Sequence, residues 1–98
     1  MFLVDMQFQD MAKITPELTA QHRSYLQQQY QSGQLLFGGR KVPRTGGILI
    51  SRHASAAELQ QVLEADPFRL SGAVSYTITE FVPVMAADEY ANLLSPTN

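Results

Sequence analysis

The sequence has 98 residues, a formal net charge of −2 and no cysteine, and 45% of its residues are hydrophobic. A chain of this length predicts a single domain with a thin core. The lack of cysteine excludes disulfides, thiolate zinc sites and cysteine nucleophiles, and it fits a reducing compartment. The slightly acidic balance argues against nucleic-acid binding, which depends on attraction to phosphates.

The sequence shows no targeting or membrane-spanning pattern. Its apolar opening, residues 1–4, is interrupted by Asp5 and has no basic lead-in, unlike a signal peptide. No window approaches the roughly 20 apolar residues that a membrane span needs. We therefore expect a cytoplasmic protein with no membrane contact.

The first two predicted elements are a strand and a helix. Apolar and polar residues alternate over residues 2–8, as in a strand with one buried face. Thr15, Pro16 and Glu17 form a helix start, because a hydroxyl can cap free N–H groups and proline suits the first helical position. Apolar residues then recur at helical spacing, and Gly33 can end the helix in the left-handed conformation.

The middle of the chain predicts two strands joined by a turn. Residues 35–37 form the second strand, which Gly38 and Gly39 are expected to stop, and residues 48–50 form the third. Paired glycines permit close approach to a ligand, but they also permit a simple turn. The turn carries a basic cluster, more typical of a solvated hairpin tip than of an anion site: Arg40, Lys41 and Arg44.

A second helix and a last strand complete the order. Ser55 and Glu58 match a reciprocal capping pattern, and Pro67 ends this helix at Asp66. Alternation from residue 74 predicts a strand that runs to residue 82, followed by a short helix over 88–94 and a frayed tail over 95–98. We expect one domain over 1–98, with a core over 1–83 and a C-terminal extension over 84–98.

The order β-α-β-β-α-β predicts an α+β, ferredoxin-like fold, an antiparallel sheet with two helices on one face. The opposite face is mixed in character, and a dimer of two such sheets packed face to face would bury it. The helices are expected to cover Phe2, Val4, Met6, Phe8, Ile48, Ile50, Val74, Tyr76 and Ile78.

Two titratable residues stand on otherwise apolar helix faces. His22 has Leu18 and Leu26 at helical spacing, and Asp66 follows Val62 by four residues. Burial of either group without a partner costs roughly a few kcal/mol, so we expect them to meet each other or a ligand. A carboxylate that binds one ring nitrogen leaves the other free for general acid–base chemistry. The pattern also fits a packing histidine and an aspartate that merely ends a helix.

Other motifs carry less chemistry. His53 is interpreted as a surface loop residue, and two histidines without HxxxH spacing give little support for a metal site. GxSxG, GxGxxG and Walker patterns are absent from the sequence. Residues 46–50 lack the aromatics on which RNA-recognition domains stack bases.

The segments 22–26, 36–39, 48–50 and 66–68, with Gly33 and Gly72, carry a family resemblance in their order and spacing. Through them the sequence resembles the YciI (YCII-related) family of the dimeric α/β-barrel superfamily, from Phe2 to about Val82. The resemblance implies a homodimer with a pocket between helices and sheet, and a His–Asp active-site pair at His22 and Asp66. It also implies small cyclic or ring-cleavage substrates and no metal or organic cofactor.

The sequence departs from the family pattern at two places. Many members have proline soon after the glycines, where this chain has Arg40, and this changes the shape and charge of the pocket mouth. Many also carry a basic residue shortly before the histidine, whereas residues 18–21 are uncharged here. If that basic residue binds an acidic substrate in the family, we expect this protein to use Arg23 or Arg40 instead, or to prefer a neutral substrate.

These observations lead to a hypothesis of a cofactor-independent enzyme. His22 is the general acid/base and Asp66 orients it, for isomerisation or elimination on a small metabolite that can be cyclic. The alternative is a non-catalytic small-ligand-binding or protein-interaction module, and haem-linked chemistry is disfavoured because no second histidine lies on a pocket face. The expected substrate-binding residues are Gly38, Gly39, Arg40 and Phe68.

Overall fold

The computed structural model describes residues 1–94, so the predicted tail at 95–98 lies outside the described part. The elements keep the predicted order, with two short helices added, one before the first long helix and one before the last strand. They are β1 (Phe2–Phe8), η1 (Met11–Lys13), α1 (Pro16–Gln31), β2 (Leu35–Arg40), β3 (Gly46–Ser51), α2 (Ala56–Glu64), α3 (Pro67–Leu70), β4 (Val74–Glu80) and η2 (Asp88–Leu93).

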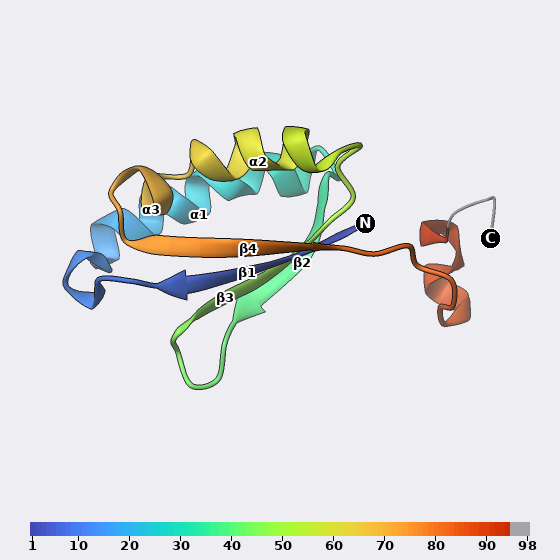
Figure 1. The fold of residues 1–98 in the computed structure, drawn as a ribbon, viewed down its shortest axis with the longest axis horizontal. Helices are drawn as coiled ribbons and strands as arrows, with labels where there is room; N and C mark the ends of the chain where they lie inside the picture. Colours follow the sequence, from blue (N-terminus) through green and yellow to red (C-terminus); the bar gives the residue numbers. More distant parts are fainter. Residues whose placement is uncertain (95–98) are drawn as a thin grey trace.

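The four strands form one antiparallel sheet in the order β2-β3-β1-β4. The helices α1, α2 and α3 all lie on the same face of this sheet (Figure 1). This is the predicted α+β, ferredoxin-like arrangement. No helix within residues 1–94 is long and apolar enough to cross a membrane.

The core lies between the sheet and the helices. Val4 in the central strand pairs with Leu49 on one side and Ile78 on the other, so these three side chains share the covered face. Ile48 and Ile50 therefore point to the open face, and the prediction that the helices cover them is wrong. The main buried cluster consists of Phe2, Val4, Met6, Leu26, Leu35, Leu49, Leu59 and Leu63.

The ends of the main helices follow the predicted caps. The Thr15 hydroxyl accepts a hydrogen bond from the Leu18 N–H at 3.1 Å, and the Ser55 hydroxyl accepts one from the Glu58 N–H at 3.1 Å. Gly33, after α1, has a φ of 81°, as a left-handed terminator should.

The second strand is longer than predicted. Gly38 and Gly39 do not stop it, because their backbones pair with Leu49 and Ile48 and the ladder continues to Arg40. Hydrogen bonds of the ladder use only backbone groups, so a glycine can form them as other residues do. Glycine is found within a strand where another side chain occupies the space that its own Cβ would take. At Gly38 that space is taken by side chains that line the cavity described below.

Candidate active site

His22 and Asp66 meet on the covered side of the sheet. The imidazole Nδ1 lies 2.8 Å from each carboxylate oxygen of Asp66, a residue 44 positions further along the chain. The Asp66 side chain is 0% exposed and that of His22 is 15% exposed. An ionised carboxylate only accepts hydrogen bonds, so Nδ1 carries the proton and donates it. Nε2 makes no hydrogen bond to residues 1–94 and is free to act on a ligand.

The sequence led us to expect Asp66 on the second helix, and this expectation is wrong. Helix α2 ends at Glu64, and Asp66 is the N-cap of the short helix α3, which Pro67 begins. One Asp66 oxygen accepts the Phe68 N–H at 2.9 Å. The same carboxylate therefore caps a helix and holds the imidazole, and the backbone fixes its position.

Phe68 sets the plane of the imidazole. Its ring stacks on that of His22 with centroids 4.0 Å apart and planes inclined by 11°. Phe68 also packs edge to face against Phe8 of β1, with centroids 6.1 Å apart. The Phe68 ring and the Asp66 carboxylate together hold the imidazole at the border of the cavity.

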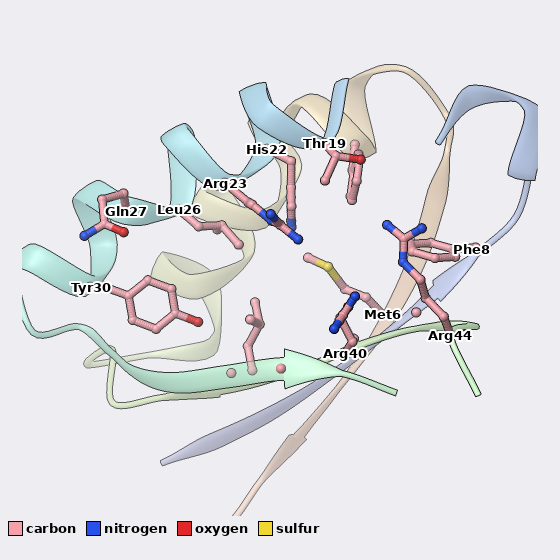
Figure 2. A pocket seen from close by; sticks show the side chains of 16 residues that line it. Met6, Phe8, Thr19, His22, Arg23, Leu26, Gln27, Tyr30, Arg40 and Arg44 are labelled. Carbon is pink, nitrogen blue, oxygen red and sulfur yellow. The ribbon is translucent and has the colours of Figure 1, made fainter. Parts of the chain in front are cut away.

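A cavity of about 330 Å³ lies between α1 and the sheet and is bordered by His22 (Figure 2). It lies in the size range, about 300–1,000 Å³, in which proteins bind small molecules. The predicted binding residues Gly38, Gly39, Arg40 and Phe68 all line it. The remaining lining residues are Met6, Phe8, Thr19, Arg23, Leu26, Gln27, Tyr30, Arg44, Gly46, Gly47 and Leu49.

Tyr30 lines the cavity, although its place in the sequence did not mark it as a site residue. It comes two turns after His22 on α1, and Figure 2 shows its hydroxyl directed toward β2. A Cβ at Gly38 would lie 2.6 Å from that hydroxyl and 2.7 Å from the Leu49 side chain. Burial raises the pKa of the Tyr30 phenol, which keeps it protonated and able to donate to a ligand. Its helical spacing from His22 was the available signal.

The predicted basic cluster is divided by the structure. Lys41 pairs with Asp5 at 2.5 Å, on the strand face opposite the buried Val4. Arg40 and Arg44 instead line the cavity, where the Arg44 guanidinium lies 5.6 Å from the centre of the Phe8 ring. Arg40 and Arg44 are also exposed, as the prediction of a solvated hairpin requires, so they are solvated side chains at the border of the cavity.

His53 is buried, 5% exposed, and the prediction of a surface position is wrong. Its Nδ1 lies 2.5 Å from the Ser51 hydroxyl and its Nε2 lies 3.0 Å from the Gln29 side-chain oxygen. Burial lowers the pKa of this imidazole, while the nearby Glu58 charge opposes that shift. His53 does not line the cavity and connects α1 with the end of β3.

Within residues 1–94, no group of three or more histidine, aspartate or glutamate side chains is placed to hold a metal ion. The candidate site consists of the imidazole–carboxylate pair, a phenol and arginines around an apolar floor. These groups can bind a small molecule and move a proton.

A ferredoxin-like sheet with a buried histidine–carboxylate pair beside a small cavity defines the class of this protein. The chain belongs to the YCII-related domain family, which it matches over residues 2–82. A solved structure with the same fold is 5-chloro-2-hydroxyhydroquinone dehydrochlorinase (TftG) from Burkholderia phenoliruptrix, in complex with 2,5-dihydroxybenzoquinone. The two share 21% sequence identity at a TM-score of 0.70, over 82% of this chain and 91% of that chain. The comparison with curated proteins gave no match.

Proposed function

We propose that this protein is a cofactor-independent enzyme in which His22 transfers protons on a small, cyclic substrate and Asp66 holds its imidazole. One observation carries the proposal. His22 binds a fully buried carboxylate through Nδ1 while its ring borders a cavity of small-molecule size. A carboxylate in that position fixes the tautomer in which Nε2 is a base, and it stabilises the imidazolium that forms.

The proposed chemistry is isomerisation or elimination. Nε2 removes a proton from a substrate carbon, and the electron pair of the broken C–H bond moves into the substrate. In an isomerisation the imidazolium returns that proton to another carbon, and in an elimination a leaving group departs with its bonding electrons. General acid–base catalysis of this kind contributes typically about 10²–10⁴ in rate.

The family and the fold support a small cyclic substrate. The similar structure is that of a dehydrochlorinase, and its complex holds a quinone. Loss of HCl from a ring compound removes a proton and a leaving group, which is a task for a general base. The alternative, a module that binds a ligand without converting it, needs the same cavity but no proton transfer.

The test compares the wild type with His22→Gln and Asp66→Asn. The two probes are chloride release from 5-chloro-2-hydroxyhydroquinone and exchange of the ring hydrogens of 2,5-dihydroxybenzoquinone in D₂O. We expect the wild type to accelerate at least one reaction, and both variants to lose about 10²–10⁴ of that rate. Glu64→Gln, an acid-to-amide change on the exposed Arg69 pair, is the matched control and should keep the rate.

A spectroscopic readout separates an active pair from a packing pair. Nitrogen-15 NMR of the wild type should show His22 as the Nδ1–H tautomer. In Asp66→Asn the amide can donate to Nδ1, and the tautomer should change to Nε2–H. Probe binding without conversion would favour the binding module. If both variants unfold, the pair is a packing element and the proposal fails.

We further propose that the protein is a homodimer joined through the open face of the sheet. Apolar side chains lie on that face at Leu3, Ile48 and Ile50. Leu3 pairs with Ile50 across β1 and β3, and Ile48, two residues before Ile50, points to the same side. Phe37, on the same face, is 63% exposed. Antiparallel sheets commonly leave one face to solvent, but that face is then polar. A second copy of the chain would cover the apolar part of this face.

The cytoplasmic location of the protein stays a prediction.

A further inference from the structure

The cavity is lined by three arginines, Arg23, Arg40 and Arg44, and none of them has an acidic partner among residues 1–94. The other four of the seven basic side chains are all engaged. Their partners are the Ser71 carbonyl for Lys13, Asp5 for Lys41, the Gly33 carbonyl for Arg52 and Glu64 for Arg69.

The arginines come from separate segments and gather around one space. Arg23 is on α1, Arg40 ends β2 and Arg44 lies in the turn before β3. Figure 2 shows their guanidinium groups reaching toward the space below His22 from different sides. No aspartate or glutamate lines the cavity, although the chain as a whole carries a net charge of −2. The positive charge is therefore concentrated where a ligand would bind.

The rest of the cavity is apolar. Its floor and walls include Met6, Phe8, Leu26, Leu49 and Phe68. Such a surface fits the body of a ring compound, while the guanidinium groups fit a planar anion that can accept paired hydrogen bonds. A carboxylate has this planar geometry.

We propose that the ligand of this cavity is a ring compound that carries a carboxylate, bound by Arg23, Arg40 and Arg44. The inference deepens the proposed function, because it names the substrate class of the same site. The anion site itself depends only on the arginines, whereas conversion of the ligand depends on His22. The two can therefore fail separately.

The test measures binding of benzoate by chemical-shift changes in amide NMR spectra, with benzamide as the uncharged analogue and phenyl phosphate as the alternative anion. We expect benzoate to bind at least about tenfold more tightly than benzamide. The affinity for benzoate should fall as the salt concentration is raised. Arg40→Gln and Arg23→Gln should each reduce benzoate affinity several-fold or more, with little effect on benzamide. Both residues are exposed, so the variants should fold, and the same spectra check this.

The matched control is Arg69→Gln, which removes the same charge at a site away from the cavity and should leave benzoate binding unchanged. Equal affinity for benzoate and benzamide, or an equal loss in Arg69→Gln, would overturn the inference. Tighter binding of phenyl phosphate would also overturn it, in favour of a phosphate ligand. In His22→Gln, benzoate binding should persist. If the wild type binds benzoate but catalyses no proton transfer, the anion site is supported and the proposed enzymatic function is wrong.

Discussion

Gly38 and Gly39 are neighbours in β2 with opposite surroundings, and this difference gives a matched pair of variants. A Cβ at Gly38 would meet the Tyr30 hydroxyl, the Leu49 side chain and the Ile48 carbonyl, all within 2.8 Å. A Cβ at Gly39 would meet nothing within 4 Å. Gly38→Ala should therefore lower the free energy of unfolding by about 1–3 kcal/mol, as other overpacked sites do.

Urea denaturation followed by circular dichroism measures this effect. Gly39→Ala is the control, and it should be neutral or stabilising by up to about 1 kcal/mol because it restricts the unfolded chain. Gly38→Ala should also move the Tyr30 phenol and so weaken ligand binding. Equal stability of the two variants would show that the groups around Gly38 move aside at little cost, and it would contradict this prediction.

At the residue scale, the sequence could predict that His22 and Asp66 need partners, because each interrupts an apolar pattern. It could not predict how Asp66 is held. The carboxylate caps α3, and a helix of four residues is too short to leave a periodic pattern. Nor could the local sequence divide Arg40 from Lys41, since the register of β2 decides which side of the sheet each of them takes, and that register is set by pairing with β3.

The buried His53 connects two elements, and its titration should make their packing depend on pH. The Ser51 hydroxyl and the Gln29 side-chain oxygen satisfy both ring nitrogens of the neutral Nε2–H form. Burial lowers the pKa of this imidazole from its ordinary value of 6.5 in the folded protein. The unfolded chain then binds more protons between the two pKa values, so the free energy of unfolding rises with pH there.

The stabilisation that comes from neutral His53 is complete above about pH 6.5 and is lost as pH falls below that value. Urea denaturation of the wild type between pH 5 and pH 8 should show this loss. His53→Gln should show a smaller change over the same range, and the difference between the two curves isolates His53 from His22. If the free energy of unfolding changes with pH in the same way in both proteins, His53 is not the cause of the pH dependence.

At the element scale, the strands and helices could be predicted, but the covered face of the third strand could not. Alternation placed the covered face of β1, and hydroxyl caps placed the starts of α1 and α2. The run Ile48-Leu49-Ile50 is apolar throughout, so it has no alternation from which to choose a face. Its pairing with β1 makes that choice and turns Leu49 inward.

The whole molecule has an open sheet face and a C-terminal segment that leaves the sheet. After β4 the chain extends away from the other elements, and η2 stands apart from them (Figure 1). Exposed apolar side chains follow along this segment, among them Val82, Val84 and Met85. Such surfaces mark interaction sites in stable proteins, which is consistent with the proposed homodimer.

Sedimentation equilibrium measures the assembly directly, and it should give a mass of twice 10.9 kDa for the wild type. Ile48→Lys would place a second lysine opposite Asp5, which already pairs with Lys41, so an uncompensated positive charge would be buried on the open face between two packed sheets, which is strongly unfavourable. We expect this variant to sediment as a folded monomer, because the side chain lies outside the helix-covered core. Val42→Lys, at a loop position that is 98% exposed, is the control and should remain a dimer. A wild-type monomer, or a dimer that survives Ile48→Lys, would exclude the open face as the interface.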